Sequence, residues 1–395
     1  MLAYGRPPLP LSLLLLSSTL PACIIALRLP HAVRYAALVG YAFVLSRACS
    51  FSTGNVHRDY SLGCLLMGQL ITTFHLLCLS DPLAQFRHES DLVPPSELSF
   101  PRRVHWSMCV FFSPRGVGWN YQVSNVPPRP SEARWTFVRQ QLFAMFRWYL
   151  VLDLAHSLHL YCPQPFWHEG GTRSIIAEGL VYRCILIAKI AVQHTQLAAV
   201  CVAAGLSAPR DWPAIYGSHA DAYTVRRYWG RSHHQMLRRF TSSIGKAVCR
   251  LLGLQPGSKA SSYMQLYVAF VVSGIMHCGG DLMVGRGIFG ASFPFYLMQA
   301  IAITLEDAVI GIARRVGLTS SSGWTRFVGY IWSMVWFGIS SQWLVNWSMR
   351  AGADPAECVS FSLIAMISHR VIHRSRIVGS SLTSVNFEDI VVLVT

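Results

Sequence analysis

Long apolar runs, separated by basic and aromatic segments, dominate the chain as far as residue 372. Most of the runs are close to the roughly 20 residues that a helix needs to cross the hydrocarbon core of a bilayer. They cover residues 9–29, 31–51, 60–79, 141–161, 175–206, 263–284, 288–313, 327–347 and 358–372. This pattern predicts an all-α protein, a polytopic transmembrane helical bundle of about 8–9 spans.

Two polar sections, rich in arginine and proline, interrupt the apolar pattern. In residues 80–139 the prolines, and the glycines of 113–120, predict an ordered, turn-rich excursion rather than a helix. In residues 207–262 a helix is predicted over 223–254, because apolar residues recur there at helical spacing between arginines. Such a basic amphipathic helix suits the membrane interface. Two spans separate the sections, so both are expected to be long cytosolic loops with interfacial helical structure, and the N-terminus is expected in the lumen.

The composition supports a membrane protein and limits the classes of partner that it can bind. Hydrophobic residues make up 52% of the 395 residues and charged residues 13%, whereas soluble proteins carry about 25% charged residues. We therefore expect one membrane domain over residues 1–395. The net charge of +15 comes mostly from loop arginines, which favours contact with membrane lipids and argues against nucleic acid. The 11 cysteines form no CxxC pair, so no metal site is expected.

His277 lies in the middle of the apolar run 263–284, and this position needs an explanation. An ionisable side chain at that depth is costly and marks a candidate functional site. One interpretation is a general base, since a neutral imidazole can take the proton of an alcohol that attacks a thioester. The alternative is a neutral histidine that only hydrogen-bonds to a neighbouring helix.

A basic and aromatic block, Arg-Arg-Tyr-Trp-Gly-Arg-Ser-His-His-Gln, occupies residues 226–235 in the section that leads into this run. Its arginines can pair with phosphates, because the guanidinium group matches phosphate geometry. The alternative is an interfacial helix that binds lipid headgroups. Elsewhere, Glu306 and Asp307 are expected to be ion-pair partners, and the Gly279-Gly280 pair is expected to be a close contact between helices.

Three motifs give the chain a family resemblance. They read Arg-Gly-Val-Gly-Trp-Asn at 115–120, Tyr-Trp-Gly-Arg-Ser-His-His-Gln at 228–235 and Ser-Gly-Ile-Met-His at 273–277. In this order, and between apolar runs, they resemble the wax-synthase-type branch of the membrane-bound O-acyltransferases. Within that branch the sequence is similar to the fungal acetyltransferases of terpenoid and meroterpenoid pathways. The family-like motifs fall mainly within residues 113–285 of a single domain.

The resemblance also implies roles for particular residues. His277 is expected to be the catalytic histidine and His234 a second catalytic residue. The acyl-CoA side is expected to comprise Trp229, Arg231, Gln235, Arg115 and Asn120. One departure is clear: Ser232 and His233 stand where the family typically has arginine and tryptophan. The family uses acetyl-CoA as a co-substrate, and no bound cofactor is expected.

The expected function is therefore transfer of an acetyl group from acetyl-CoA to a lipophilic alcohol in secondary metabolism. Other enzymes of the same biosynthetic pathway are expected partners, and the membrane is expected to be the endoplasmic reticulum. One alternative is a long-chain acyltransferase that makes wax or sterol esters. Another is a transporter or receptor; an internal repeat would favour a transporter, and the sequence shows no such repeat.

Overall fold

The computed structural model describes residues 5–161, 172–317, 323–353, 359 and 361–367. Within these residues the chain is helical, with two isolated β-bridges and no strand. Single 3-10 turns lie at Ala48–Ser50, Pro95–Glu97, Pro209–Asp211, His219–Asp221 and Arg286–Ile288. The predicted all-α class is confirmed. Of the predicted run at 358–372, residues 359 and 361–367 are described, with 363–367 helical, and the others lie outside the described residues.

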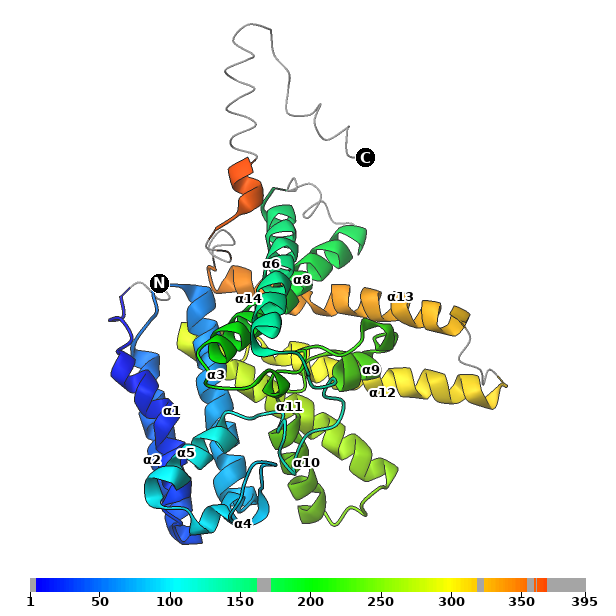
Figure 1. Ribbon diagram of the computed structural model, residues 1–395. Helices are drawn as coiled ribbons and strands as arrows, with labels where there is room; N and C mark the ends of the chain where they lie inside the picture. Colours follow the sequence, from blue (N-terminus) through cyan, green and yellow to red (C-terminus); the bar gives the residue numbers. More distant parts are fainter. Residues whose placement is uncertain (1–4, 162–171, 318–322, 354–358, 360, 368–395) are drawn as a thin grey trace, which may run out of the picture.

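Three helices near the N-terminus stand side by side at one end of the molecule (Figure 1). They are α1 (Leu11–Ala26), α2 (His31–Arg47) and α3 (Val56–Phe74). The Asn55 side chain caps α3 by accepting a hydrogen bond from a backbone N–H of the first turn at 3.0 Å, which satisfies one amide group left open at the helix start. A single π-helical turn, His75–Leu79, extends α3 into the first polar section.

Four helical segments are long and apolar enough to cross a membrane. They are His31–Ser50, Val56–Leu79, Lys259–Val284 and Arg286–Arg315, and each coincides with a predicted span. Helix α1 is also apolar but has only 16 residues. The membrane character predicted from the apolar runs is therefore present in the part of the chain that the structure describes.

A pair of long helices, α6 (Arg134–Tyr161) and α8 (Thr172–Ala203), crosses the middle of the molecule (Figure 1). They pack along each other, and α13 (Gly323–Ser340) packs across α8. Glycines make this crossing close, because a Cβ added to Gly179 would lie 1.9 Å from the carbonyl oxygen of Gly338. A larger residue at either position would therefore push the two helices apart.

The predicted run at 327–347 forms two helices rather than one, since α13 ends before Ser341 and α14 (Gln342–Arg350) begins after it. Serine favours helix ends over helix interiors, because its hydroxyl competes for backbone hydrogen bonds. Helix α12 (Phe293–Arg315) extends away from the centre in the same direction as α13 (Figure 1). The two are joined where the Trp336 indole N–H of α13 donates to Gln299 of α12 at 3.0 Å.

The first polar section contains one longer helix beside its turns. Helix α5 (Phe100–Phe111) occupies its middle, and Pro101 sits in the first turn of that helix. The prediction of turns rather than a helix was wrong for these residues, because proline breaks a helix only beyond its first turn. Residues 112–121 do form turns. The short helix α4 (Pro82–Gln85) and several turns complete the section.

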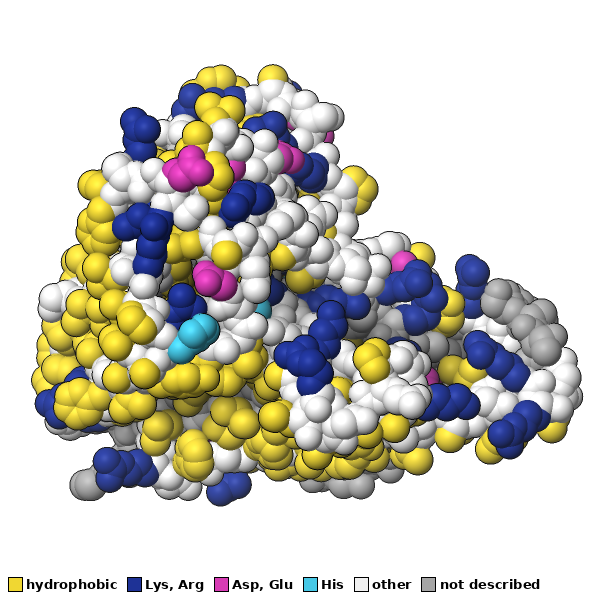
Figure 2. All heavy atoms as spheres, turned by 90° about the horizontal axis from the view of Figure 1, so that it is seen from below, with side chains coloured by type: hydrophobic (Ala, Val, Ile, Leu, Met, Phe, Trp, Pro, Cys, Tyr) yellow, Lys and Arg dark blue, Asp and Glu magenta, His cyan; other side chains and the backbone are white. Residues whose placement is uncertain are grey.

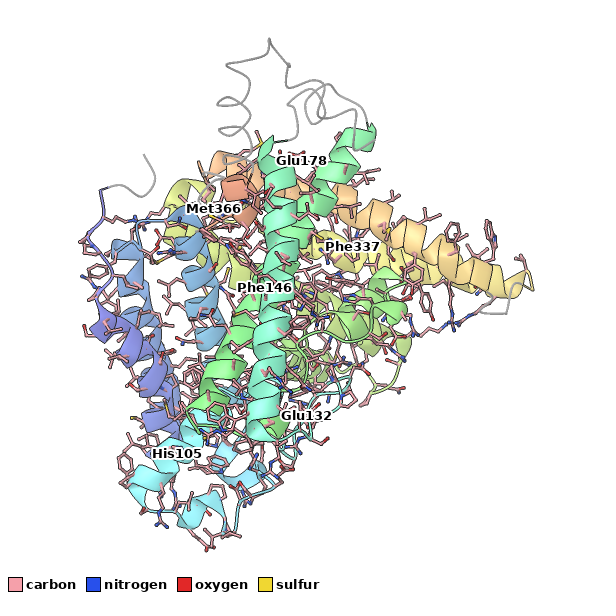
Figure 3. The ribbon with its side chains drawn as sticks, turned by 45° about the horizontal axis from the view of Figure 1, so that its top comes forward. His105, Glu132, Phe146, Glu178, Phe337 and Met366 are labelled. Atoms are coloured by element: carbon pink, nitrogen blue, oxygen red, sulfur yellow. The ribbon has the colours of Figure 1, made fainter. Side chains whose placement is uncertain are left out.

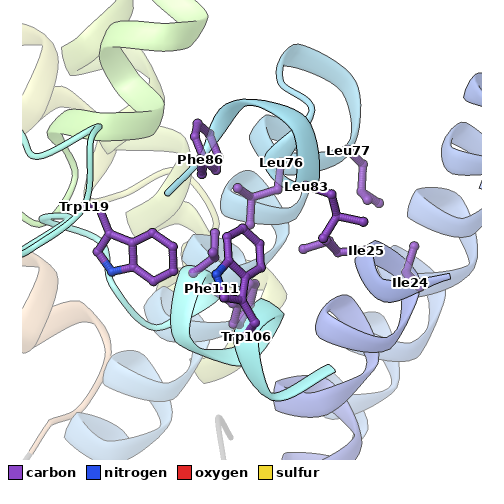
Figure 4. Packing of buried hydrophobic residues seen from close by; sticks show 10 residues of the cluster. Ile24, Ile25, Leu76, Leu77, Leu83, Phe86, Trp106, Phe111 and Trp119 are labelled. Atoms are coloured by element: carbon purple, nitrogen blue, oxygen red, sulfur yellow. The ribbon is translucent and has the colours of Figure 1, made fainter. Parts of the chain in front are cut away.

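Ten buried apolar side chains fasten the first polar section to the bundle (Figure 4). They are Ile24, Ile25, Leu76, Leu77, Leu83, Phe86, Trp106, Val110, Phe111 and Trp119. The first two belong to α1 and the next two to the π-turn after α3. Burying one large apolar side chain contributes about 1.5–3 kcal/mol, so the section is a packed part of the fold.

The second polar section is not the continuous helix predicted over 223–254. A three-residue helix, α9 (Val225–Arg227), runs into a π-helical turn at Tyr228–Ser232, and α10 (Arg238–Leu251) begins only after an extended stretch. Glu306 accepts the first two backbone N–H groups of α9 at 2.7 and 3.1 Å. It thus caps the start of α9 instead of forming the predicted ion pair. The predicted helix breaks further on, before α10, where the side-chain amide of Gln235 hydrogen-bonds to the backbone carbonyls of Trp229 and His233.

The helix that carries His277, α11 (Lys259–Val284), packs against α3, α10 and α12. Glycines make its contact with α3 close: a Cβ added to Gly279 would lie 2.8 Å from the carbonyl oxygen of Gly63. One added to Gly280 would lie 2.5 Å from the Tyr60 ring. The predicted close helix contact at Gly279-Gly280 is confirmed.

Candidate active site

His277 faces α3 and α12 from the middle of α11, and its side chain is half-buried. Its Nδ1 lies 3.0 Å from the Tyr60 hydroxyl and 3.3 Å from the Cys64 sulfur. The imidazole stacks on the Tyr296 ring of α12, with ring centres 4.2 Å apart and an interplanar angle of 14°. The structure records no hydrogen bond from Nε2 to any residue that it describes. One ring nitrogen is therefore held by α3, while the other is open to a substrate.

The two histidines that follow the π-turn lie close to His277. His233 and His234 have ring centres 4.0 Å apart, and His233 Nδ1 lies 2.9 Å from the Tyr228 hydroxyl. The pKa of His233 is held well below its usual range, first by burial and then by His234, Arg183 and His277 nearby. The three imidazoles therefore lie in one region of the interior.

His234 is neutral at neutral pH. Burial, and then the positive charge of Arg115, lower its pKa to about 4. Its Nδ1 is buried and has no hydrogen-bond partner among the described residues. A neutral imidazole with an open nitrogen can accept or donate a hydrogen bond to a polar substrate, so His234 supplies a second polar group beside His277.

Several residues of this site were not found from the sequence. Tyr60, Cys64 and Tyr296 lie in other apolar runs, where tyrosine and cysteine are ordinary core residues. Arg183 of α8 did carry a signal, because it is a charged residue inside a predicted span. It is buried, with 8% of its surface exposed, and its guanidinium lies 4.6 Å from the centre of the Tyr228 ring.

Trp229, at the start of the basic block, packs inside the protein rather than at its surface. Its ring contacts Phe270 of α11 and Phe295 of α12, with ring centres 5.6 and 6.5 Å apart. Its indole N–H donates to Gln299 at 3.3 Å. Trp229 therefore links the turn that carries His233 to the two helices that flank His277.

Gln235 fixes the shape of the same turn. Its buried side-chain amide donates to the backbone carbonyls of Trp229 and His233 at 3.1 and 2.7 Å. Its Oε1 accepts from Arg238 at 2.9 Å. The amide is thus used mainly to hold the turn, and with it the orientation of both neighbouring histidines.

Most arginines of the basic block are engaged within the protein. Arg226 forms an ion pair with Asp307, and Arg227 forms one with Asp221. The ion-pair role predicted for Asp307 is therefore confirmed. Arg231 differs, because its side chain is 51% exposed and its guanidinium lies 3.9 Å from Asp221. A weak pair at this distance and exposure leaves the group able to meet an anionic ligand.

Arg115 and Asn120, both in the first motif, are hydrogen-bonded to the backbone. The buried Arg115 guanidinium donates to the carbonyls of Ala214 and Pro213 at 2.7 and 2.9 Å, which ties the first polar section to the second. Asn120 is exposed and donates to the Gln85 carbonyl at 2.8 Å. Arg115 lies near enough to His234 to lower its pKa, whereas the hydrogen bonds of Asn120 stay within the first section.

Replacement of Arg115 by methionine is expected to destabilise the protein whether or not acyl-CoA is present. The change removes both backbone hydrogen bonds, and an unsatisfied buried carbonyl costs about 1–3 kcal/mol. Thermal unfolding in detergent should therefore begin several degrees lower than in the parent. The exposed Arg231→Met is the matched control and should change stability by less than about 0.5 kcal/mol. An unchanged melting temperature for Arg115→Met would contradict the structural role.

A cavity of about 520 Å³ with a mixed polar and apolar lining lies between α6, α8 and the start of the second polar section. Its lining includes Arg147, Trp148, His194, Trp212, Tyr216 and His219. Tyr216 also stacks on His233, with ring centres 5.8 Å apart, so the cavity wall leads toward the histidines. Cavities that bind small molecules usually measure about 300–1,000 Å³. Figure 2 shows that basic side chains outnumber acidic ones on the face seen from below.

The described part of the chain is helical and contains four helices that are long and apolar enough to cross a membrane. The sequence of residues 212–298, which includes His234 and His277, matches the membrane-bound O-acyltransferase family. The chain belongs to this family, and it is an acyltransferase.

The relatives are fungal. The acetyltransferase ple2 of Rhodocybe pseudopiperita is 34% identical over 310 residues, which cover 75% of this chain and 79% of the relative. The acetyltransferase eriL of Hericium erinaceus is 30% identical, with coverage of 72% and 77%. The O-mevalon transferase yanI of Aspergillus niger is 27% identical, with coverage of 88% and 87%. The fungal branch of the family that the three motifs indicated is confirmed.

Proposed function

We propose that the protein transfers an acetyl group from acetyl-CoA to a hydroxyl of a lipophilic secondary metabolite, a terpenoid or meroterpenoid. The observation that carries the proposal is the placement of His277, with Nδ1 held by α3 and Nε2 open. The names of the relatives support the acetyl group, since ple2 and eriL are acetyltransferases. The apolar helices around the site support a lipophilic acceptor that arrives from the membrane.

His277 acts as the general base in the proposed reaction. Its Nε2 takes the proton of the acceptor alcohol, and the alcohol oxygen forms a bond to the thioester carbonyl carbon. The carbon–sulfur bond then breaks, and the CoA thiolate takes the proton back from His277. Acetyl transfer is direct, without a covalent acyl-enzyme. His234 provides a second polar contact within the same group of imidazoles.

The acyl-CoA side of the site is formed by the two polar sections. Arg231 offers an exposed cation to the phosphates of acetyl-CoA. Trp229 and Gln235 hold the turn between the acyl-CoA side of the site and His277. Arg115 and Asn120 shape the first section around this entrance. The size and basic lining of the cavity beside Tyr216 support it as the space that receives the CoA moiety.

The membrane topology completes the proposal. The bundle has about 8–9 spans, with both polar sections in the cytosol, where acetyl-CoA is present, and the N-terminus in the lumen. The protein resides in the endoplasmic reticulum and passes its product to other enzymes of one pathway. The exposed basic side chains of the polar sections support this orientation, because cytosolic flanks of spans are enriched in arginine and lysine.

Acetyl-CoA is expected to be a better donor than palmitoyl-CoA by about tenfold or more, since a pocket shaped for a short chain discriminates at each added methylene. The test measures transfer of a labelled acyl group to a panel of terpenoid alcohols in microsomes that contain the protein. Microsomes without it are the control. Faster transfer of palmitate would instead establish the long-chain acyltransferase. Binding of an alcohol without transfer from either donor would favour a transporter or receptor.

A further inference from the structure

Arg183 of α8 is a buried cation that the proposed reaction does not use. Three arginines are buried among the residues that the structure describes, and the side chain of Arg183 is one of them. The other two, Arg115 and Arg239, donate to backbone carbonyls at distances between 2.7 and 3.2 Å. Arg183 donates to no backbone carbonyl of a described residue, and no described carboxylate lies within ion-pair distance of it. A buried charge without a partner is costly, so its position needs another reason.

The guanidinium of Arg183 contacts aromatic rings instead. Its central carbon lies 3.8 Å from the centre of the Phe337 ring on α13 and 4.6 Å from that of Tyr228. The centre of the Trp229 ring lies 5.5 Å away. Aromatic faces attract a cation within about 6 Å, most strongly where water is excluded. Arg183 thus joins α8 and α13 to the first two residues of the π-helical turn at 228–232.

The close crossing of α8 and α13 brings the cation to Phe337. Gly179 lies one helical turn before Arg183, on α8. A Cβ on Gly179 would overlap the carbonyl oxygen of Gly338, the residue after Phe337, so the two helices meet through their backbones at this point. Phe337, labelled in Figure 3, also lies against the turn, since its ring centre is 4.6 Å from that of Tyr228. The cation is therefore held where α8, α13 and the turn meet.

The turn at 228–232 needs such contacts, because it is a single π-helical turn between a three-residue helix and an extended stretch. Trp229 and Gln235 fix it through hydrogen bonds of their side chains. Tyr228 connects it to the histidines, since the phenol oxygen lies 2.9 Å from His233 Nδ1. A group that holds the face of the Tyr228 ring therefore also orients the residues that follow in the second motif.

We propose that Arg183 is a positioning residue, whose positive charge holds the turn at 228–232 in the conformation that binds acyl-CoA. This inference rests on the proposed acyl-CoA role of that turn. Arg183 acts through Tyr228 and Trp229, whereas His277 is held separately by α3. Loss of the charge should therefore weaken binding of the acyl donor and leave the chemical step at His277 intact.

Arg183→Met tests the proposal, because it removes the charge and keeps a long, unbranched side chain. Replacement of a buried, unpaired charge by an apolar group is neutral or stabilising, so the melting temperature in detergent should be no lower than that of the parent. KM for the acyl donor should rise about 5- to 30-fold, as expected for loss of cation–π contacts in a dry site. The kcat and the KM for the alcohol should change less than about twofold. A purely structural role would instead lower the melting temperature and kcat together.

Three further variants separate charge from shape. Arg183→Lys keeps the charge, and an ammonium group also binds aromatic faces, so it should restore KM for the donor to within about threefold of the parent. Phe337→Leu keeps the cation and removes the nearest ring; it should raise the same KM about threefold or more, and it decides the case if Arg183→Met aggregates. Arg139→Met makes the same change at an exposed position of α6 and should leave KM within about twofold.

Amide hydrogen exchange of the full-length protein in detergent tests the turn without any substrate. Peptides that cover residues 228–235 should exchange at least about threefold faster in Arg183→Met than in the parent, because exchange reports local opening. Arg183→Lys and Arg139→Met should exchange as the parent does. This measurement decides the positioning role independently of catalysis. A parent that transfers neither acetyl-CoA nor palmitoyl-CoA would overturn the proposed function alone.

The kinetic constants are measured with whichever of these two donors the parent transfers faster. Faster exchange of the turn in Arg183→Met, with a raised donor KM that Arg183→Lys restores, would establish the proposal. Unchanged exchange in Arg183→Met, or equal losses in Arg183→Lys and Arg183→Met, would overturn it. A fall in kcat at unchanged KM would also overturn it, because Arg183 would then act on the chemical step rather than on the turn.

Discussion

His277→Ala is expected to reduce acetyl transfer by about two to four orders of magnitude, the usual contribution of a general base. Among the described histidines, the variant loses the one whose Nδ1 is held by α3 and whose Nε2 has no hydrogen bond to a described residue. His233 cannot replace it, because its Nδ1 is engaged with Tyr228 at 2.9 Å and its ring lies on the turn before α10. Labelled acetyl-CoA and a lipophilic alcohol in microsomes provide the measurement, normalised to the amount of protein.

His105→Ala is the control for this experiment. His105 is an exposed residue of α5 at the foot of the molecule (Figure 3), in the first polar section. Its activity should stay within about twofold of the parent, since exposed substitutions away from a site have small effects. Equal activity of His277→Ala and the parent would return His277 to the alternative interpretation of a hydrogen-bonded core histidine.

Gly63→Leu is expected to abolish both the folded bundle and its activity. A Cβ at Gly63 would lie 2.2 Å from the carbonyl oxygen of Gly279, and backbone cannot move aside as a flexible side chain can. Overpacking of a tight core costs about 1–3 kcal/mol and sometimes more, and here the whole of α3 would have to shift from α11. That shift would also remove Tyr60 and Cys64 from His277.

Gly40→Leu provides the comparison, because it places the same side chain in a helix where nothing lies within 4 Å of the added Cβ. Both variants are heated in detergent, and the surviving monodisperse fraction is measured by size exclusion. Gly40→Leu should behave as the parent does, whereas Gly63→Leu should be largely aggregated. Survival of Gly63→Leu with normal activity would show that the contact between α3 and α11 is not tight.

The sequence was informative about the elements that carry local chemistry. Apolar length predicted the membrane helices around His277, and the glycine pair predicted the tight contact of α11 because small residues mark close helix crossings. It failed where a distant residue decides the local structure. Glu306, about 80 residues away, caps the short helix that starts at Val225, and no periodicity in the segment itself can reveal that.

The candidate site was only half predictable for the same reason. His277 and His234 belong to recognisable motifs, but Tyr60 is 217 residues from His277 and lies in an ordinary apolar run. Arg115 illustrates the opposite error: an arginine in a motif suggests a ligand contact, yet its guanidinium donates to two backbone carbonyls and ties two loops together. The same side-chain N–H groups can bind a ligand or stabilise the fold. Only the three-dimensional contacts show which of the two roles a residue has.

The distance in sequence between α3 and α11 has a consequence for biogenesis. Ribosomes add about 5–20 residues per second, so Tyr60 is in the bilayer for about 10–40 s before a partner 217 residues later is synthesised. During that time the surface of α3 around Gly63, which later contacts Gly279 of α11, faces lipid or the insertion machinery. Membrane insertion and formation of the catalytic pocket are therefore separate events. A variant that inserts and accumulates normally can still lack its active site. Quality control in the cell would then have to recognise a membrane helix without its packing partner, rather than an unfolded chain.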